Sequence, residues 1–400
     1  MIALAFFATL INYLDRQALS VAAPILQIQF HMSSVGYSRV LFAFMLAYTI
    51  MNGISGLLID RLGTKFGYGL FVAWWSASAM LHTFARGVWS LGAFRFLLGL
   101  GEAGNWPGAV KVVAEWFPQE ERALASGIFN SGSSVGAILA PPVIAGLVLG
   151  YGWRSAFVTV GGLGFLWLAA WVVFYRSPVT NEIQSKPDAA PALGVLLRSR
   201  FVRTFTIAKI FVDPVWYFYT FWFPEYLFHA RHFDLAAIGR YAWIPFFVAG
   251  AGSVGGGLIA KTFVKLHVPL SEARKAAVTV AAGMMAMSIP AVLVREPRMS
   301  IALVSIAMAG YTAALANMLA MPADVFPRGG AASVYGLASM GSGFGGMVFA
   351  LVTGWLVDRY SYEPVFWLFG LIPLIGIFIL WVLMGRLEPE SSFLTEATAN

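Results

Sequence analysis

Six ionisable side chains lie well inside long apolar stretches of this 400-residue chain. They are Asp15, Arg16, Arg95, Glu102, Lys209 and Asp213. On the insertion scale, a charged residue near the centre of a bilayer costs roughly 3 kcal/mol. Six of them facing lipid would cost on the order of 15–20 kcal/mol, which is more than the net stability of a typical fold. We therefore expect these side chains to face a protein interior or an aqueous cavity, where they could bind ions or protons.

The spacing of two acid–base pairs indicates how each pair could be satisfied. Lys209 and Asp213 are four residues apart and can pair on one helix face, so a structural and a functional role stay equally open for them. Arg95 and Glu102 are seven residues apart, which places both on one helix face about 10 Å apart along the axis. Gly99 lies between them and leaves room for a ligand or a neighbouring helix. We expect Arg95 and Glu102 to form a proton-sensitive pair.

Asp15, Arg16, Arg95 and Glu102 form a set whose net charge depends on protonation. Asp15 and Arg16 are adjacent and point about 100° apart on a helix, so neither easily neutralises the other. With both acids ionised the set is neutral, and with both protonated the two arginines become available to an anion. Burial favours the neutral carboxyl, whereas a nearby arginine favours the carboxylate. We therefore predict that Asp15 and Glu102 bind protons. Arg16 and Arg95 should bind a small anionic substrate, with Arg16 on its carboxylate.

The composition is that of a polytopic membrane protein. Hydrophobic residues make up 59% of the chain and charged residues 11%, against about 25% charged residues in an average soluble domain. The absence of cysteine excludes disulfides, Cys-ligated metals and thiol catalysis. The five histidines have no metal-ligand spacing, and no phosphate-binding P-loop motif occurs. We expect no metal, no cofactor and no ATP-driven step.

Twelve apolar runs are long enough to cross a bilayer as helices. They cover residues 3–28, 36–59, 67–85, 88–116, 121–149, 154–174, 201–228, 236–260, 273–294, 299–322, 331–357 and 362–385. Prolines inside several runs predict kinks. A sustained polar stretch divides the runs six and six. The sequence predicts an all-α membrane protein with an N-terminal six-helix bundle (1–175), a cytoplasmic linker (176–200), a C-terminal six-helix bundle (201–388) and a cytoplasmic tail (389–400).

The distribution of basic residues indicates the orientation in the membrane. More Lys and Arg residues flank the spans on the side of the N-terminus than on the opposite side, and positively charged loops stay in the cytoplasm. We therefore place both termini in the cytoplasm. This topology accounts for the formal net charge of +7 without a nucleic-acid partner. Because the chain begins very close to the first span, we expect a short basic leader upstream of it.

The two halves of the chain echo each other weakly. The stretch Gly56–Arg61 at the end of the second span recurs as Gly256–Lys261 at the end of the eighth. Parallel duplication of six-helix units around a shared binding site is a recurring transporter design. In the first copy, we expect Asp60 to cap or pair across a cytoplasmic gate and Arg61 to assist it. A role in topology alone stays equally open for Arg61.

Polar side chains within the spans could contact a carboxylated or polyhydroxylated ligand. We select Tyr13, Tyr48, Asn130, Asn317 and Trp216 as candidate substrate contacts. Aromatic and hydroxyl groups are also ordinary helix-packing material. The asparagines are more informative, because an unpaired amide in an apolar bundle is costly.

The pattern G-x-G-x-x-G occurs three times, beginning at Gly99, Gly250 and Gly341. A dinucleotide site would need a preceding strand and a βαβ unit, whereas each of these stretches lies inside an apolar run. Small residues at such spacing let helices approach closely. We therefore interpret the three patterns as helix packing.

Several motifs resemble those of the major facilitator superfamily. The stretch Gly56–Lys65 is similar to the loop signature of that superfamily. Within the superfamily, Asn12–Arg16, Arg95–Pro107 and Asp213–Tyr219 resemble the anion:cation symporters, above all the bacterial hexuronate (glucuronate and galacturonate) and sugar-acid proton symporters. The resemblance covers essentially the whole chain, and the motifs of the first and fourth spans are specific.

The resemblance implies proton symport of an organic anion by alternating access across the bacterial inner (plasma) membrane. It assigns the working roles to Asp15, Arg16, Arg95 and Glu102, with Tyr13 and Tyr48 facing the substrate in sugar-acid members, and we expect a monomer. A galactonate-type member would carry Gln where Ser133 stands, which favours a cyclic uronate. The particular sugar acid, the proton stoichiometry and sodium in place of protons stay open.

Two alternatives would use similar helices. A proton-coupled antiporter that exports a drug or metabolite would share the fold, but many such proteins carry G-P-x-x-G-G in the fifth span, and the stretch Ala140–Gly146 does not match it. A membrane enzyme or nutrient sensor would need an extra-membrane domain or an intramembrane catalytic group, and the sequence indicates neither. We expect a transporter and not an enzyme.

Overall fold

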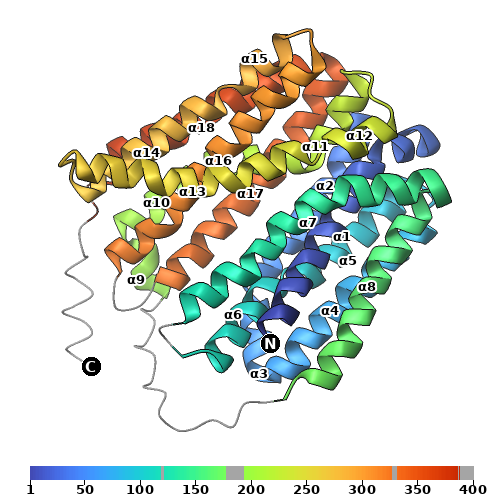
Figure 1. Ribbon diagram of the computed structural model, residues 1–400, viewed down its shortest axis with the longest axis horizontal. Coiled ribbons are helices and arrows are strands. Elements are labelled where there is room, and N and C mark those ends of the chain that lie inside the picture. The colour runs from blue at the N-terminus through green and yellow to red at the C-terminus, as the bar shows by residue number, and fades with distance from the viewer. Residues whose placement is uncertain (119–120, 177–192, 327–330, 386, 388–400) are drawn as a thin grey trace. The chain divides into compact units, whose positions relative to one another are not determined.

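The computed structural model describes residues 1–118, 121–176, 193–326, 331–385 and 387. In these residues every regular element is a helix and none is a strand. Figure 1 shows long helices joined mostly by short connections. The predicted all-α class is confirmed.

All twelve predicted spans are helical within the described residues, and seven coincide with one continuous α-helix. These are α1 (Ile2–Phe30), α4 (Thr64–Leu81, followed by the 3₁₀ turn η1, His82–Phe84), α7 (Arg122–Tyr151), α8 (Trp153–Phe174), α16 (Pro297–Val325), α17 (Ala331–Arg359) and α18 (Tyr362–Leu383).

The other five spans are each divided into two helices. They are α2 (Ser34–Asn52) with α3 (Ser55–Leu62), α5 (Val88–Glu102) with α6 (Asn105–Trp116), α10 (Arg200–Val212) with α11 (Pro214–His229), α12 (Leu235–Tyr241) with α13 (Ile244–Lys265), and α14 (Leu270–Met285) with α15 (Ser288–Leu293). A further short helix, α9 (Leu193–Arg198), lies in the stretch predicted as a linker.

Prolines account for most of these divisions. Four of the five second helices carry a proline in their first turn, at Pro107, Pro214, Pro245 and Pro290. Proline lacks the backbone N–H and clashes with the carbonyl four residues earlier, so it is tolerated in a first turn but breaks a helix interior. The predicted kinks are confirmed at these positions, whereas Pro24 lies inside the continuous helix α1, and Pro141 and Pro142 lie inside the continuous helix α7.

Eight helical segments in the described part of the chain are long and apolar enough to cross a membrane by length and composition. None of the eight contains any of the six predicted intramembrane charges, which lie on α1 and α5 and around the junction of α10 and α11. In α1, for example, Asn12, Asp15, Arg16 and Gln17 interrupt the apolar sequence. The other helices that carry or flank these charges, α5, α10 and α11, have 15, 13 and 16 residues and are too short to be counted among the eight.

The chain groups into two compact units. The first comprises Met1–Val179, Tyr217–Phe247 and Gly346–Val365, and the second comprises Thr180–Trp216, Val248–Gly345 and Phe366–Asn400. The predicted bundles stay a prediction. Most of the predicted linker and the whole predicted tail lie outside the described residues.

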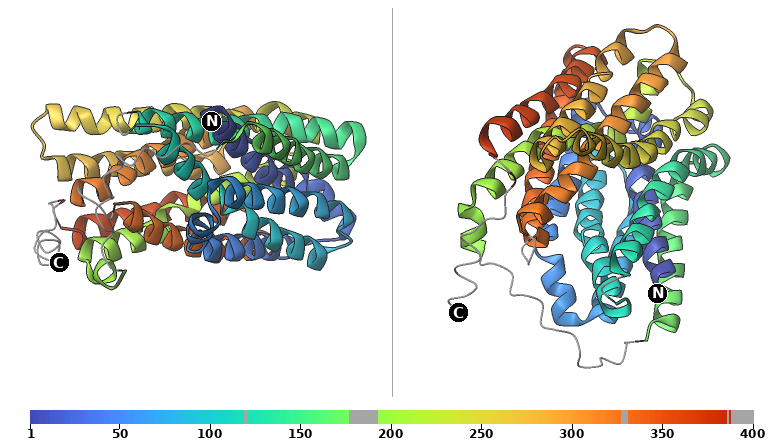
Figure 2. Two further views of the ribbon diagram at one scale, coloured as in Figure 1. Left: turned by 90° about the horizontal axis from the view of Figure 1, so that it is seen from below. Right: turned by 60° about the vertical axis from the view of Figure 1, so that its left-hand side comes forward.

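In the first unit, α1 packs against α7, α2 against α5, and α4 against α8 (Figures 1 and 2). Glycines make the closest of these contacts possible. A Cβ on Gly132 of α7 would lie 2.4 Å from the carbonyl oxygen of Phe6, and one on Gly99 of α5 would lie 2.5 Å from that of Phe44. The space that the sequence reserves at Gly99 is therefore occupied by the backbone of α2.

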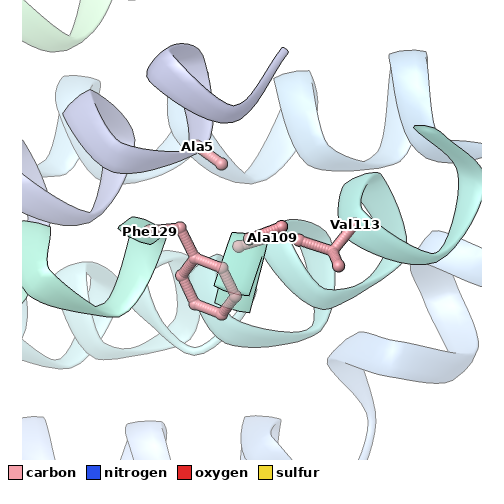
Figure 3. Packing of buried hydrophobic residues seen from close by; sticks show 5 residues of the cluster. Ala5, Ala109, Val113 and Phe129 are labelled. Atoms are coloured by element: carbon pink, nitrogen blue, oxygen red, sulfur yellow. The ribbon is translucent and has the colours of Figure 1, made fainter. Parts of the chain in front are cut away.

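A small apolar cluster fixes the beginning of α1 in the same unit. Ala5 of α1 meets Ala109 and Val113 of α6 and Phe129 of α7 (Figure 3). These side chains are at most 3% exposed. Three helices are thereby held together below the charged part of α1.

In the second unit, α14 packs against α16. A Cβ on Gly252 of α13 would lie 2.3 Å from the carbonyl oxygen of Ala309, and one on Gly341 of α17 would lie 2.7 Å from that of Thr206. The second and third G-x-G-x-x-G stretches lie on helices, the first runs from α5 into the turn before α6, and each contains a glycine at a helix contact. The helix-packing interpretation is confirmed.

Candidate functional site

The centre of α1 presents Arg16 to a glutamate of another helix. Arg16 is 4% exposed and Glu102, the last residue of α5, is fully buried. Nη2 of Arg16 lies 2.9 Å from Oε2 of Glu102, and Nε donates a hydrogen bond to the same oxygen at 3.0 Å. Charge-assisted contacts of this kind are about twice as strong as neutral hydrogen bonds.

This ion pair corrects the expectation that Glu102 pairs with Arg95. The two residues lie on one helix, but two turns separate them by about 10 Å along the axis. Arg16 reaches Glu102 from α1 instead. Arg95 and Glu102 lie on one helix, as their spacing predicts. The sequence alone did not reveal that Arg16 of another helix would pair with Glu102.

Aromatic rings surround the Arg16 guanidinium. Its Cζ lies 4.7 Å from the ring centroid of Tyr48, 5.1 Å from that of Tyr13 and 5.6 Å from that of Phe44. Cation–π attraction at such distances is stronger where water is excluded. Nη2 also donates to Oδ1 of Asn12 at 3.4 Å. The predicted contacts Tyr13 and Tyr48 thus lie beside the predicted anion-binding arginine, and Phe44 joins them without having been predicted.

Arg95 is buried with much of its hydrogen-bonding capacity unused. It is 1% exposed, and its Nη1 donates to the backbone oxygen of Arg16 at 3.4 Å. Its Nε and Nη2 have no hydrogen-bond partner among the described residues. A buried charged group with unsatisfied donors is costly, so Arg95 is suited to receive the oxygens of an anion.

Asp15, like Arg95, is a buried charged group with polar atoms that have no hydrogen-bond partner among the described residues. It is 2% exposed, and neither carboxylate oxygen has a hydrogen-bond partner in the described part of the chain. Glu102 acts on it as a like charge and Arg95 as an opposite charge. The four predicted groups therefore lie within one unit, with one ion pair and two unsatisfied members. Binding a proton to an unsatisfied carboxylate, and an anion to an unsatisfied guanidinium, would relieve both.

The predicted gate residues lie at the junction of α3 and α6. The Asp60 side chain is 68% exposed and its Oδ1 lies 2.8 Å from Nζ of Lys111, which also donates to the carbonyl of Ile59. Arg61 is exposed. Asp60 on α3 thus pairs with Lys111 on α6. Lys111 lies inside the fourth predicted span and had no predicted role.

In the second unit, the Lys209–Asp213 pair is self-contained. Nζ of Lys209 lies 2.7 Å from Oδ2 of Asp213, and the two side chains are 2% and 4% exposed. Tyr311 donates to Asp213 at 3.5 Å, and the ring of the predicted contact Trp216 stacks on Tyr311 at 5.5 Å. The ring of Tyr335 lies 5.3 Å from the ammonium. The structural role left open for this pair is the one that its contacts favour.

The two predicted asparagines have different surroundings. Asn317 of α16 is 1% exposed, and its Nδ2 donates to the carbonyls of Gly256 at 2.9 Å and Ala313 at 3.1 Å. Its Oδ1 has no hydrogen-bond partner among the described residues. Asn130 is exposed on α7, where its backbone oxygen accepts from Ser133. A substrate contact for either asparagine stays a prediction.

Sequence reasoning missed Glu225, a fully buried carboxylate on α11. It lies near the end of a predicted span, where a charge attracts little attention. The signal that was available is a proline directly before it and a histidine four residues after it, at His229. No group of three or more potential metal ligands occurs in the part of the chain that the structure describes.

The sequence matches the family model of the Major Facilitator Superfamily over residues 5–295 and 268–399. It is 31% identical over 402 residues to the hexuronate transporter of Escherichia coli (strain K12), with 96% of this chain and 93% of that protein covered. It is 33% identical over 303 residues to the galacturonate transporter of Dickeya chrysanthemi, with 71% of this chain and 88% of that protein covered.

Among solved structures, the chain is similar in fold to a D-xylose–proton symporter. The TM-score is 0.76 at 15% sequence identity, and the match covers 97% of this chain and 98% of the other. Since the family and the relatives are membrane transporters, the predictions of a multi-pass membrane protein and of a transporter rather than an enzyme are confirmed. The chain belongs to the Major Facilitator Superfamily.

Proposed function

We propose that this transporter imports an organic anion together with protons by alternating access, and that the anion is a hexuronate or a related sugar acid. The buried cluster of Asp15, Arg16, Arg95 and Glu102 carries the proposal, because it holds one ion pair and two unsatisfied charged groups. The hexuronate and galacturonate transporters among its relatives support the choice of substrate.

Coupling in this scheme depends on the Arg16–Glu102 ion pair. While Glu102 is ionised it neutralises Arg16, whose guanidinium is then poorly available to a substrate carboxylate. A proton on Glu102 removes that competitor and leaves Arg16 free to bind the anion. Binding of the proton and of the substrate therefore favour each other, as linkage requires for symport.

Asp15 would bind a second proton, and Arg95 would make a second contact with the substrate. A proton on Asp15 removes an unpaired buried charge. Arg95, with two unused nitrogens, would donate hydrogen bonds to a further substrate oxygen. Tyr13 and Tyr48 would flank the sugar ring beside Arg16, since both rings already lie within about 5 Å of its guanidinium.

The remaining assignments belong to the same proposal. Asn130, Asn317 and Trp216 would contact hydroxyls of the substrate, and Asp60 with Arg61 would act at the cytoplasmic gate. The protein would work as a monomer in the bacterial inner membrane with both termini in the cytoplasm. No cofactor or metal is part of the scheme.

Uptake into proteoliposomes tests the function. Labelled glucuronate and galacturonate are offered under an imposed inward proton gradient, with and without sodium, against competing sugar acids and dicarboxylates. We expect accumulation that a proton ionophore abolishes and that does not need sodium. Accumulation that requires sodium would contradict the choice of proton. No uptake of any anion by folded protein would overturn the proposal and favour the antiporter alternative.

A further inference from the structure

Pro224 leaves backbone acceptors open near the end of α11, and side chains from two other helices use them. Because proline has no N–H, the carbonyl of Thr220, four residues earlier, loses its usual donor. Oγ of Ser20 on α1 donates to Thr220 at 2.9 Å and to the carbonyl of Phe221 at 3.1 Å. The hydroxyl of Tyr37 on α2 donates to Phe221 at 2.8 Å. The part of α11 that leads to Glu225 is thereby held against α1 and α2.

Glu225 lies one turn further along α11 than Phe221 and is fully buried. Its side chain is 1% exposed, and apart from a contact with His229 neither oxygen has a hydrogen-bond partner among the described residues. One turn further along α11, Nε2 of His229 lies 3.1 Å from Oε2 of Glu225 and 3.1 Å from Oε1 of Gln27 on α1. The His229 side chain is 42% exposed. A buried carboxyl is thus linked to the surface by a single imidazole.

The groups that face Glu225 from the neighbouring helices do not neutralise it. Tyr37 of α2 and Tyr362 of α18 both lie close enough for the charge of Glu225 to act on their hydroxyl groups. The nearby Asp358 of α17 is occupied in accepting the N–H groups of Ser34 and Val35, each at 2.8 Å. No lysine or arginine in the described residues forms an ion pair with Glu225.

We propose that Glu225 and His229 form a proton-binding site, separate from Asp15 and Glu102, whose proton is taken up when the end of α11 closes against α1 and α2. Sealing an ionised carboxylate away from water beside a neutral imidazole is strongly disfavoured, so the closed pair should hold a proton. When the helix end opens, water can hydrate the carboxylate and the proton leaves. The closed pair therefore holds one proton more than the open pair, on Glu225 Oε2 or shared with His229 Nε2.

This proposal rests on the proposed function, because it takes the proton as the coupled ion. It adds a further proton-binding step to the transport cycle. According to the predicted topology, this end of α11 faces the outside. A proton bound there would belong to closure of the outer side, before substrate release inside. Linkage fixes the sign: raising the external pH favours the open arrangement, since opening releases the proton.

Because the chain has no cysteine, a single introduced thiol can report on opening. Thr220 is 1% exposed and its Oγ1 has no hydrogen-bond partner among the described residues, so Thr220→Cys removes no contact. Its labelling by a membrane-impermeant thiol reagent is measured against pH in proteoliposomes without substrate. Ser361→Cys, at an exposed position next to Tyr362, corrects for the pH dependence of the reagent itself.

We expect the corrected labelling of Thr220→Cys to rise with pH, by up to about tenfold per pH unit, which is the limit for one titrating proton. Adding Glu225→Gln should make labelling slow and independent of pH, because the neutral amide is sealed in without a proton. Glu363→Gln, which alters an exposed carboxylate beside Tyr362, should leave the pH dependence in place.

Labelling that stays pH-dependent with Glu225→Gln would overturn the proposal, and so would labelling that is independent of pH when Glu225 is present. Neither result depends on which anion is carried. Conversely, absence of sugar-acid uptake together with the expected labelling would reject the proposed substrate and leave the proton site standing.

Discussion

Two buried acid–base groups of this transporter, one in each compact unit, differ in how completely they are satisfied. Lys209 and Asp213 are four residues apart in sequence and meet at 2.7 Å. Arg16 and Glu102 are 86 residues apart in sequence and lie on different helices. Beside them, Asp15 and Arg95 keep unsatisfied atoms.

The comparison indicates how a structural pair can be told from a working one. A buried ion pair that forms between residues one helical turn apart has no reason to change, because breaking it leaves an uncompensated charge. A cluster that joins two helices and leaves an acid and a base unsatisfied can exchange partners when a proton or an anion arrives. The following predictions test that distinction, beginning with the largest effect.

Arg16→Ala should remove measurable binding of the anion. Losing the buried charge pair between Arg16 and the substrate carboxylate should cost about 3–5 kcal/mol of binding free energy. This corresponds to a loss of affinity of at least about 100-fold. Equilibrium binding of labelled glucuronate to purified protein measures the effect, with size-exclusion chromatography as the control for folding. Unchanged affinity would move the carboxylate site elsewhere, first of all to Arg95.

Glu102→Gln should abolish accumulation driven by a proton gradient and spare exchange of labelled for unlabelled substrate. The amide resembles the protonated acid, so Arg16 stays available to the anion while the proton site is lost. Both assays use the same proteoliposome preparation, and exchange therefore controls for folding. Accumulation against a gradient by Glu102→Gln would refute the role given to this residue.

Asp213→Leu alone should destabilise the protein by about 3–5 kcal/mol, because Lys209 is left buried without its partner. The double variant Lys209→Met/Asp213→Leu should recover most of that loss, since two apolar side chains replace the pair. Thermal unfolding in detergent measures both. The double variant should also keep transport. A stable double variant that has lost transport would make the pair functional and remove the distinction drawn above.

Asp60→Asn should have the smallest effect on stability. The Asp60 side chain is 68% exposed, and an exposed ion pair contributes at most about 1 kcal/mol. If Asp60 acts at the gate, uptake should slow severalfold at unchanged affinity, and Lys111→Gln should match it. An effect on uptake from Asp60→Asn alone would show that the pair with Lys111 is not the acting contact.

Features that depend on local sequence could be predicted. Helices were predicted correctly in all twelve apolar runs, and eight helical segments of the described residues are long and apolar enough to cross a membrane. The division of four spans into two helices could be predicted from Pro107, Pro214, Pro245 and Pro290, because proline removes a hydrogen bond from the helix that contains it. The unsatisfied charges of α1 and α5 were identified for the same reason: their cost does not depend on the partner.

Features that depend on contact between helices could not be predicted. The approach of α2 to Gly99 and the reach of Arg16 to Glu102 are set by packing, which one sequence does not reveal. Glu225 was overlooked because it lies near the end of a predicted span, and its full burial depends on packing between helices. Asp60 was correctly expected to pair, but its partner Lys111 lies on another helix.

The central claim is that the anion and the proton move together. It is tested by adding glucuronate outside proteoliposomes that contain a pH indicator, at zero membrane potential and without sodium or an imposed pH gradient. The account predicts acidification of the lumen that begins with substrate entry and is absent in Glu102→Gln. Entry of labelled glucuronate without acidification would contradict it.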